Sequence, residues 1–500
     1  MVTKAGTRFQ LKRAGGLLRL LVRNRMALIG MILLILFSST ALAAPLLSPY
    51  STSDIVSGSL AQPEWVMNFP DGYYLSKNVV VVNDPLLSSP ASVQAWAFTA
   101  SSSTISNVQM SYAPGVFSSI PSQGSIQLAY SGASPGTVKL SQSFQFPYHG
   151  PPKKFIASFA VLISGASQAS PVHVRVFIDR IGDQVFNLID QDMTFNGQWL
   201  PQGGATALDS TADSWNNVPV KTILGTQNSR FDPATIIFSS IQSYSYGIEL
   251  TFNGPAKVNI DSLQLKLYGT AFGLLGTDNA GNDLLSKNIY GSRISLLVGL
   301  LAAGIGISLG LLIGLMAGFL GRFVDEVLMR FTDMMLVIPS LPLLIVLVEV
   351  LGTNIWNVII IIGFLGWMGF ARVIRSQVLT LRERPYIEAA KAAGAGPLRI
   401  MSRHIFPNIV SLTYVNLALS VPAAILSEAA LAFLGLSDAS IVSWGHIFQD
   451  VNHSGALSLN PPPWWWVIPP GILIAAISLS FILIGYALDE IFNPKLRSRR

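Results

Sequence analysis

Six long apolar runs alternate with polar segments along this chain of 500 residues. A helix of about 20 apolar residues is long enough to cross the roughly 30 Å of hydrocarbon in a lipid bilayer. The runs are Met26–Leu47, Leu296–Leu320, Phe331–Val350, Ile355–Ile374, Leu412–Leu434 and Val467–Leu488. The pattern therefore predicts a mainly α-helical, polytopic membrane protein with six transmembrane helices.

Between the first two runs, from about Ser48 to Thr270, the pattern changes to Ser, Gly, Pro, Asn and Gln interleaved with short β-branched and aromatic stretches. Examples are "KFIASFAVLIS", "PVHVRVFID", "YGIELTF" and "KVNIDSLQLKLYG". In the second of these, Val172, Val174, Val176 and Ile178 share one face, and His173, Arg175 and Asp179 lie off it. Strands of this kind, bounded by Gly, Pro and Asn, predict an inserted all-β domain, a sandwich of the jelly-roll type.

Three tryptophans of this segment, Trp96, Trp199 and Trp215, are open to two interpretations. They can form a platform for sugars, or they can pack in the core, which is the commoner role of tryptophan in such a domain. The sequence assigns the domain no ligand.

Charge gives the orientation. Half of the residues are hydrophobic, 12% are charged and the formal net charge is +6. Positive residues cluster before the first run, after the last run and between the fourth and fifth, whereas the inserted segment has 10 basic and 13 acidic residues. The basic residues at the termini are Lys4, Arg8, Lys12, Arg13, Arg19, Arg23, Arg25, Lys495, Arg497, Arg499 and Arg500.

Cytoplasmic loops of membrane proteins are enriched in Lys and Arg. We therefore expect a multi-pass protein of the cell (cytoplasmic) membrane, with both termini in the cytoplasm and the inserted domain outside. Lipid and topology account for the basic excess, so no nucleic-acid partner is expected. The first run is long for the h-region of a cleaved signal peptide, which is the alternative interpretation.

Motifs of catalysis are missing from the sequence. It has no cysteine, no G-x-x-x-x-G-K-[ST] phosphate loop, no H-E-x-x-H zinc motif and no G-x-S-x-G elbow. Its five histidines are spread along the chain without ligand spacing. We expect a protein that is not an enzyme and that binds no metal or cofactor itself.

Three features of the runs are candidates for the translocation path or for an interface between helices. Gly306, Gly310, Gly314 and Gly318 leave one stripe of a helix free of side chains, which lets another helix approach closely. Pro339 and Pro342 each remove a helical hydrogen bond and predict a kink or an unwound turn. Glu428 is a carboxylate in a hydrocarbon span, so it either lines a path or forms a hydrogen bond between helices.

A polar stretch, "EAAKAAGAGPLRIMSRHIFPN" from Glu388 to Asn408, interrupts the apolar pattern. Pro385 and Glu388 suit a helix N-terminus, and Gly394 and Gly396 stop that helix. Pro397 then begins a second short helix, which Pro407 is expected to end. Its predicted apolar face consists of Leu398, Met401 and Ile405, and its basic face of Arg399 and Arg403. The pair is predicted to lie at the cytoplasmic mouth of the bundle.

The spacing E-A-A-x-x-x-G, followed by ten residues and I-F-P-N, resembles the EAA loop of ABC-importer permeases of the dipeptide/oligopeptide (peptide/nickel) family. "LLRLLVRNRMALIGMILL", "LGTDNAGNDLL", "ILSEAALAFLGL", the "SWG" of Ser443–Gly445 and "NPKLR" also resemble this family, in its C-type membrane subunit. The resemblance implies a type I importer fold. It also implies a coupling contact with an ATPase, made by Glu388, Ala389, Ala390, Lys391, Gly394, Arg399 and Arg403.

The implied partners are a second homologous permease, two ATP-binding cassette ATPases that bind ATP and magnesium, an extracellular solute-binding protein and the lipid bilayer. The implied cargo is a peptide or a related solute, such as an oligosaccharide or a nickel complex. We expect three parts: residues 1–47, the insertion 48–270, and a permease core 271–500 with its coupling loop at 380–408.

The chain departs from the family in its large insertion and in Tyr486, where the family usually has Asp. Two other functions remain open: an ion-driven carrier or channel, or a membrane anchor for the β domain. Asn452 begins an N-x-[ST] sequon in the loop expected outside.

Overall fold

The computed structural model describes residues 22–101, 104–116, 123–199, 207–211 and 232–492. The chain forms two compact units, one of Met1–Thr52 with Leu284–Arg500 and one of Ser53–Asp283. The second unit begins and ends with segments that pair: Val56 N donates to Gly281 O over 2.9 Å and Leu60 N to Asp278 O over 2.8 Å. Most of the basic terminal residues lie outside the described residues, so the cytoplasmic termini stay a prediction.

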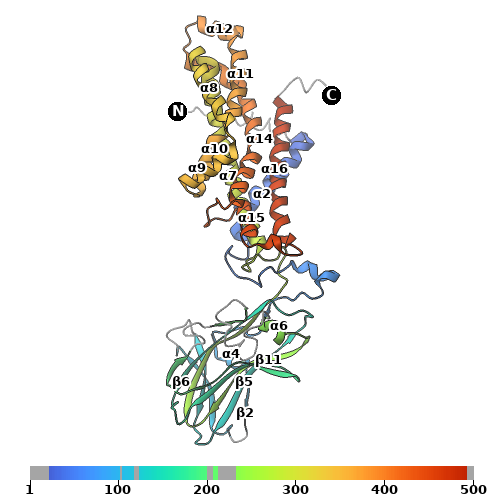
Figure 1. Cartoon of the computed structure of the whole chain (residues 1–500), viewed down its shortest axis with the longest axis vertical. Coiled ribbons are helices and arrows are strands. Elements are labelled where there is room, and N and C mark those ends of the chain that lie inside the picture. Colours follow the sequence, from blue (N-terminus) through green and yellow to red (C-terminus); the bar gives the residue numbers. More distant parts are fainter. Residues whose placement is uncertain (1–21, 102–103, 117–122, 200–206, 212–231, 493–500) are drawn as a thin grey trace. The chain divides into compact units, whose positions relative to one another are not determined.

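The first unit is helical (Figure 1). Its elements are α2 (Arg25–Leu42), α3 (Ala44–Leu47), α7 (Leu284–Leu320), α8 (Arg322–Val337), α9 (Ser340–Leu351), α10 (Ile355–Leu365), α11 (Met368–Arg382), α12 (Pro385–Ala392), α13 (Pro397–Ile400), the π-helix η4 (Met401–Ile405), α14 (Phe406–Phe433), α15 (Trp444–His453), the short η5 (Ala456–Ser458) and α16 (Trp464–Phe492).

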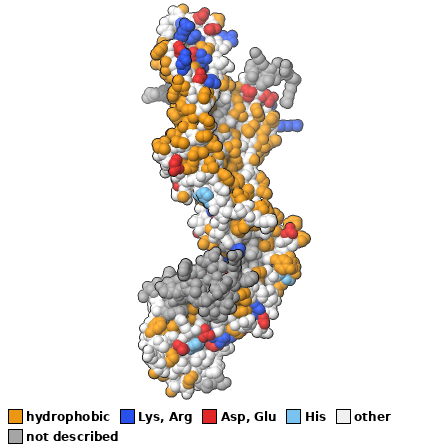
Figure 2. All heavy atoms as spheres, in the orientation of Figure 1, with side chains coloured by type: hydrophobic (Ala, Val, Ile, Leu, Met, Phe, Trp, Pro, Cys, Tyr) orange, Lys and Arg blue, Asp and Glu red, His pale blue; other side chains and the backbone are white. Residues whose placement is uncertain are grey.

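Among the described residues, five helical segments are long and apolar enough to cross a membrane, or six if the bent pair α8 and α9 is one span. The prediction of a polytopic helical protein is confirmed. Hydrophobic side chains cover much of the surface of this unit, while charged side chains gather around α8, α11 and α12 (Figure 2). This distribution is that of a helix bundle with apolar walls and one polar end.

The third predicted span is broken rather than straight. Helices α8 and α9 meet at an angle of 90° at Ile338 and Pro339. Pro339 is the N-cap of α9 and Pro342 lies in its first turn, where the missing N–H has no helical partner to lose. The predicted break therefore falls at Pro339, and Pro342 is accommodated without a second break.

The second unit is β-rich, as predicted. Its strands are β1 (Val79–Val80), β2 (Ala97–Ala100), β3 (Val108–Pro114), β4 (Gly124–Tyr130), β5 (Gly136–Phe146), β6 (Lys154–Ser164), β7 (Val172–Arg180), β8 (Gln184–Met193), β9 (Gly197–Trp199), β10 (Ala207–Asp209), β11 (Gln242–Phe252) and β12 (Ala256–Tyr268). Short helices are η1 (Glu64–Asn68), η2 (Pro70–Gly72), α4 (Pro90–Gln94) and α6 (Pro233–Ile237).

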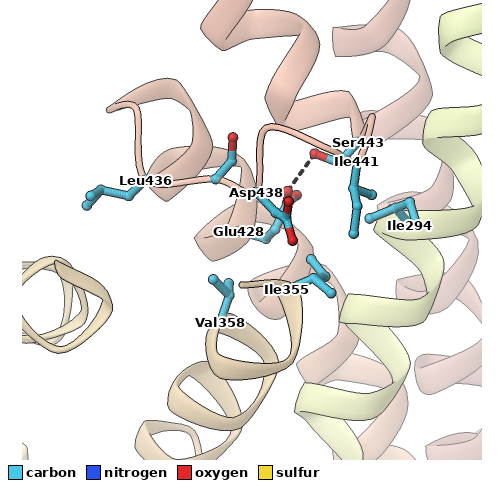
Figure 3. A pocket seen from close by; sticks show the side chains of 9 residues that line it. Ile294, Ile355, Val358, Glu428, Leu436, Asp438, Ile441 and Ser443 are labelled. Atoms are coloured by element: carbon cyan, nitrogen blue, oxygen red, sulfur yellow. Dashed lines mark hydrogen bonds between the residues drawn. The ribbon is translucent and has the colours of Figure 1, made fainter. Parts of the chain in front are cut away.

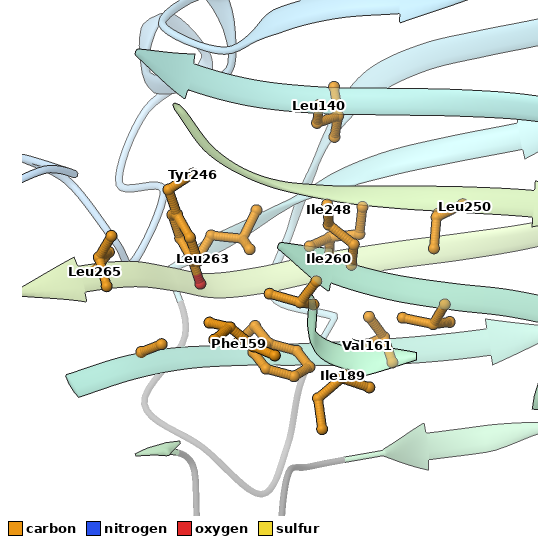
Figure 4. Packing of buried hydrophobic residues seen from close by; sticks show 14 of the residues in the cluster. Leu140, Phe159, Val161, Ile189, Tyr246, Ile248, Leu250, Ile260, Leu263 and Leu265 are labelled. Atoms are coloured by element: carbon orange, nitrogen blue, oxygen red, sulfur yellow. The ribbon is translucent and has the colours of Figure 1, made fainter. Parts of the chain in front are cut away.

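Two antiparallel sheets enclose the core of this unit. One follows the order β10-β6-β12-β4-β3, with β1 and β9 paired off this path, and the other the order β2-β5-β11-β7-β8. Side chains from both sheets form one buried cluster, which includes Phe159 and Ile260 from the first and Leu140 and Ile248 from the second (Figure 4). Layered sheets with such a shared apolar core form a β-sandwich.

Strand β7 shows the predicted alternation, because Val172, Val174, Val176 and Ile178 are all buried. Phe177 is buried as well, on the opposite face of the sheet, where it lies beside Gly247 of β11 and Lys139 Nζ is 4.4 Å from its ring centroid. Trp96 is buried in the core, so core packing is the correct interpretation for it. The side chains of Trp199 and Trp215 lie outside the described residues.

Candidate functional site

Helix α12 ends in a closed hydrogen-bonded turn. The N–H of Ala395 donates to Ala390 O over 3.0 Å, and that of Gly394 donates to Lys391 O over 2.9 Å. Gly394 has φ +81°, the left-handed conformation that glycine adopts at little cost. These are the bonds of a Schellman motif, which satisfies the last carbonyls of the helix and turns the chain sharply.

One buried side chain holds α12 against the bundle. Ile387 is fully buried in an apolar cluster with Ile374 and Val378 of α11, Ile400 of α13 and Ile409 of α14. Apart from Ala390, the remainder of the helix faces outward. Of the predicted coupling residues, Glu388, Ala389, Lys391, Gly394, Arg399 and Arg403 are exposed, and Ala390 is half-buried against the cluster.

The second short helix differs from the prediction. Pro407 does not end it, because the π-helix η4 continues into α14, with Phe406 N donating to Met401 O five residues earlier. The wider π-turn relieves the clash that a proline ring makes with the carbonyl four residues before it. The buried positions are accordingly Ile400 and Ile405, five residues apart, whereas Leu398 is 78% exposed, which contradicts its predicted place on an apolar face.

Exposed apolar side chains accompany the charged ones on this segment. Tyr386 is 44% exposed and Leu398 is 78% exposed. A surface that combines such side chains with small alanines and scattered charges is suited to contact with another protein. The exposure of Leu398 is not predicted from the sequence, because the prediction applies α-helical spacing to a segment that contains a π-helical turn.

Ion pairs join the bent pair to α11. Arg375 Nη2 donates to Asp325 Oδ2 over 2.6 Å, with a second, shorter contact from Nε to Oδ1. Arg372 Nη2 donates to Asp333 Oδ1. Phe331 also stacks on Trp367 at 6.1 Å between ring centroids. These contacts fix α8 beside α11, the helix that leads into the loop at 380–408. The partners are far apart in sequence, so no local pattern reveals them.

The glycine ladder lies between α7 and α11. A Cβ on Gly310 would lie 2.7 Å from Trp367 O, and one on Gly314 would lie 2.6 Å from Ala371 O. For Gly306 the nearest atom would be Gly363 O at 3.1 Å, and for Gly318 it would be Val378 Cβ at 2.7 Å. These distances leave no room for a side chain at Gly310, Gly314 and Gly318, and the contact at Gly306, with the end of α10, is tight. The ladder therefore sets how closely the backbones approach.

A cavity of ≈ 190 Å³ opens among α7, α9, α10 and α14. Most of its lining is small or apolar, with three hydroxyls, those of Ser340, Ser420 and Ser427. Ser420 and Ser427 donate to the carbonyls four residues earlier in α14, each over 2.8 Å. Gly306 lines this cavity, and Ser340 follows Pro339 directly. The cavity therefore brings one member of the ladder next to the break in the third span.

Glu428 is buried in α14 and accepts a hydrogen bond from Ser443 Oγ over 2.6 Å (Figure 3). Ser443 also caps α15, because its Oγ accepts from His446 N over 3.0 Å. The other carboxylate oxygen, Oε2, has no hydrogen-bond partner among the described residues and faces a cavity of ≈ 10 Å³, about the room of one water molecule. Glu428 thus connects α14 to the loop before α15.

Titratable groups of this loop are shifted by their surroundings. The hydroxyl of Ser440 holds the pKa of Asp438, which lines the same small cavity, below its usual value. Burial lowers the pKa of His446, against the opposing effect of Asp450. Asp438 is therefore anionic and His446 neutral at neutral pH. Among the described residues no group of three or more potential ligands can hold a metal ion.

Comparison with known proteins identifies the helical unit. Residues 310–498 match the binding-protein-dependent transport system inner membrane component, and residues 15–63 match the N-terminal TM domain of oligopeptide transport permease C. The oligopeptide transport system permease protein OppC of Escherichia coli (strain K12) is 40% identical over 206 residues, 41% of this chain and 67% of that protein. The OppC protein of Bacillus subtilis is 35% identical over 207 residues, 41% of this chain and 66% of that protein.

The chain thus spans about two thirds of the length of these relatives. Among solved structures, a chain of the MetNI methionine ABC transporter is 18% identical, covers 41% of this chain and 94% of that one, and has a TM-score of 0.31. The carbohydrate-binding module TmCBM61 is 8% identical, covers 37% of this chain and 97% of that one, and has a TM-score of 0.23. Neither score establishes a common fold. The sequence matches do establish the family: the chain belongs to the inner-membrane components of binding-protein-dependent transport systems, among the peptide ABC transporter permeases.

Proposed function

We propose that this chain is one of two permease subunits of an ATP-driven importer and that α12 is the element on which a separate ATPase acts. The observation that carries the proposal is the way α12 is presented. Its outer face is exposed and carries Tyr386, Glu388, Ala389, Lys391 and Ala392. Its inner face is Ile387, buried with half-buried Ala390 in a cluster that includes residues of α7, α11 and α14. A push on α12 is therefore transmitted to three membrane helices at once.

The division of labour follows from the residues present. The chain contains no phosphate-binding loop, so two partner ATPases would bind ATP and magnesium and this chain would remain non-catalytic. Glu388, Lys391, Arg399 and Arg403 offer charges of both signs to the ATPase cleft, and Ala389 permits close approach. A second homologous permease would complete the path, and a solute-binding protein would deliver the cargo.

The candidate path passes the cavity of ≈ 190 Å³ beside Pro339. Its small side chains and three hydroxyls offer space and hydrogen bonding without fixed charge, which suits passage of a peptide or a related solute better than tight retention. The proposed location is the cell membrane, with the termini and α12 in the cytoplasm and the β-rich unit outside. Selection of the cargo is assigned to the binding protein.

Co-purification tests the coupling assignment. The tagged full-length chain is extracted in mild detergent from its native membrane, and its partners are identified by mass spectrometry. In the test variant, Glu388–Gly394 is replaced by a Gly/Ser linker, and in the control variant the exposed pair Glu326 and Arg330 of α8 is changed to Gln. We expect a second permease and an ATPase with the unmodified chain and the control, and loss of the ATPase alone with the linker variant.

Recovery of the unmodified chain without any ATPase would refute the proposal and favour a carrier or an anchor. Uptake measurements separate these further. An importer requires ATP, an ion-driven carrier requires an ion gradient, and an anchor loses its whole function when the β-rich unit is deleted.

A further inference from the structure

An aromatic patch lies exposed on the β-rich unit, made by Trp65, Phe69, Tyr73 and Tyr74. These side chains are 42%, 57%, 53% and 71% exposed, respectively. They belong to η1, η2 and the residues that follow. Leu274, 59% exposed, adjoins them, because its carbonyl accepts the indole N–H of Trp65 over 3.0 Å. Large exposed apolar patches on folded proteins mark contacts with other molecules or with membranes.

The patch is built on a fixed backbone. A Cβ on Gly72 would lie 2.2 Å from Val66 O, and one on Gly150 would lie 1.8 Å from Tyr74 O, so both segments are packed without room for a side chain. Tyr73 stacks on His149 at 4.2 Å between ring centroids. The rings are therefore held outward by packing beneath them.

The patch also lies at the end of the unit where the chain enters and leaves. Gln62, three residues before Trp65, pairs with Ala271, and Ile55 pairs with Asn282. Helix α3 ends at Leu47, six residues before Ser53, and α7 begins at Leu284, directly after Asp283. Because an extended chain covers at most about 3.5 Å per residue, six residues reach roughly 20 Å. The chain therefore joins this end of the unit to α3 through six residues and to α7 directly.

Its chemistry is that of a membrane interface. Tryptophan and tyrosine are enriched where hydrocarbon meets headgroups, because they combine an apolar ring with a polar tip. Nearby polar groups are already engaged: Glu64 accepts from Lys77 Nζ over 2.7 Å and from Gly273 N over 3.2 Å. The exposed carboxylate of Asp71 lies beside the rings, and its negative charge would not attract anionic lipids. A sugar platform would need several hydrogen-bonding groups beside the rings. Because Glu64 and Lys77 are occupied with each other, Asp71 is the remaining charged group in residues 64–77.

We infer that the aromatic patch inserts into the headgroup region of the bilayer and holds the β-rich unit at the membrane surface. The occupant is a lipid surface, recognised through aromatic rings rather than through lipid charge. Insertion of four rings on a rigid backbone adds a restraint on the unit to that of its two covalent connections. The inferred contact goes beyond the proposed transport function and does not depend on it.

Because the sequence contains no cysteine, single cysteines can be introduced without removing others. The full-length chain carries a nitroxide at Phe69→Cys or Tyr74→Cys and is reconstituted into phosphatidylcholine proteoliposomes. The matched control is Phe195→Cys, an aromatic residue that is 42% exposed. Phe195 lies just after β8, two residues beyond Met193, which pairs with Val172 of β7. Through β11, Val172 lies level with Gly136, the first residue of β5. The last residue of β5, Phe146, is three residues before His149, which stacks on Tyr73. The 11 residues of β5 separate the two sites by about 35 Å.

Collision rates with oxygen, which concentrates in lipid, and with a water-soluble nickel complex report the depth of each label. We expect the oxygen-to-nickel ratio at 69 and 74 to exceed that at 195 several-fold, and to be unchanged when anionic lipid replaces part of the phosphatidylcholine. Equal ratios at the three sites would overturn the inference. So would water-exposed labels at 69 and 74 that soluble oligosaccharides protect, which would show a sugar platform, or insertion that appears only with anionic lipid.

Discussion

The guanidinium of Arg375 in α11 pairs with the carboxylate of Asp325 in α8, with Nη2 2.6 Å from Oδ2, across 50 positions of the sequence. Both side chains are largely shielded, at 35% and 20% exposure. Two parallel N–H···O bonds fix the relative orientation of the two groups as well as their distance. The pair therefore ties the first arm of the bent span to the helix that leads into α12.

Asp325→Asn should lower the stability of the helical unit by about 1–3 kcal/mol, because it leaves a shielded guanidinium without its counter-charge. The measurement is the thermal unfolding midpoint of the purified chain in detergent. Glu326→Gln is the matched control, since the neighbouring Glu326–Arg330 pair is exposed at 59% and 73% and is worth little. Equal shifts of the unfolding midpoint in the two variants would contradict a stabilising role of the Asp325–Arg375 pair.

Gly394→Val should abolish coupled transport while the protein stays folded. A β-branched residue at φ +81° costs about 1–2 kcal/mol and should distort the turn after α12, although no atom lies within 4 Å of the added Cβ. Gly396→Val is the control, because a Cβ there also meets nothing within 4 Å and its φ is −67°. Substrate uptake and ATPase recovery are measured for both variants, and normal uptake in Gly394→Val would count against the coupling role.

Gly314→Ala should destabilise the bundle by about 1–3 kcal/mol, because its Cβ would lie 2.6 Å from Ala371 O and force α7 and α11 apart. Gly304→Ala, on the same helix, adds a Cβ that meets nothing within 4 Å and should be neutral or slightly stabilising. The yield of monodisperse protein and the unfolding midpoint distinguish them. If Gly314→Ala behaved like Gly304→Ala, the close approach of the two backbones would be wrong.

Ser443→Ala should cost about 2 kcal/mol, because it removes the cap of α15 and the hydrogen bond to buried Glu428 together. Ser440→Ala is the control, since Ser440 donates to Asp438 over 2.6 Å at an exposed site and does not cap a helix. Unfolding midpoints are compared at pH 7. Adding Glu428→Met to Ser443→Ala should recover part of the loss, because it removes the orphaned carboxylate, and no recovery would contradict the proposed connection.

Several elements could be predicted from the sequence because they rest on local rules. Long apolar runs predict the membrane-spanning helices, Pro339 predicts the break between α8 and α9, and Gly394 predicts the end of α12. The alternation of β7 gave its buried face. In each case the deciding interactions lie within a few residues of one another, so spacing alone carries the information.

Other elements depend on contacts between distant residues. The Asp325–Arg375 pair and the Ser443–Glu428 bond join segments whose approach follows from packing, which no local pattern encodes. The sequence does not reveal the π-helical turn before Pro407. Regular α-helical spacing therefore places Leu398 on the buried face, whereas it is exposed. The glycine ladder lies between these cases. The spacing of its glycines predicts that another helix packs closely on α7, and the structure shows that this neighbour is mainly α11.

The right-angled corner between α8 and α9 has a consequence for the chain on its own. Where a helix stops, its last carbonyls lose their partners, and hydrocarbon cannot supply new ones. At this corner Met334 is 67% exposed and Val337 is 83% exposed, so the backbone there lies at the surface of the isolated subunit. Such a corner is stable in a membrane only beneath another polypeptide or beside water. The single chain therefore leaves backbone at Pro339 that needs a partner polypeptide or water to cover it in a membrane.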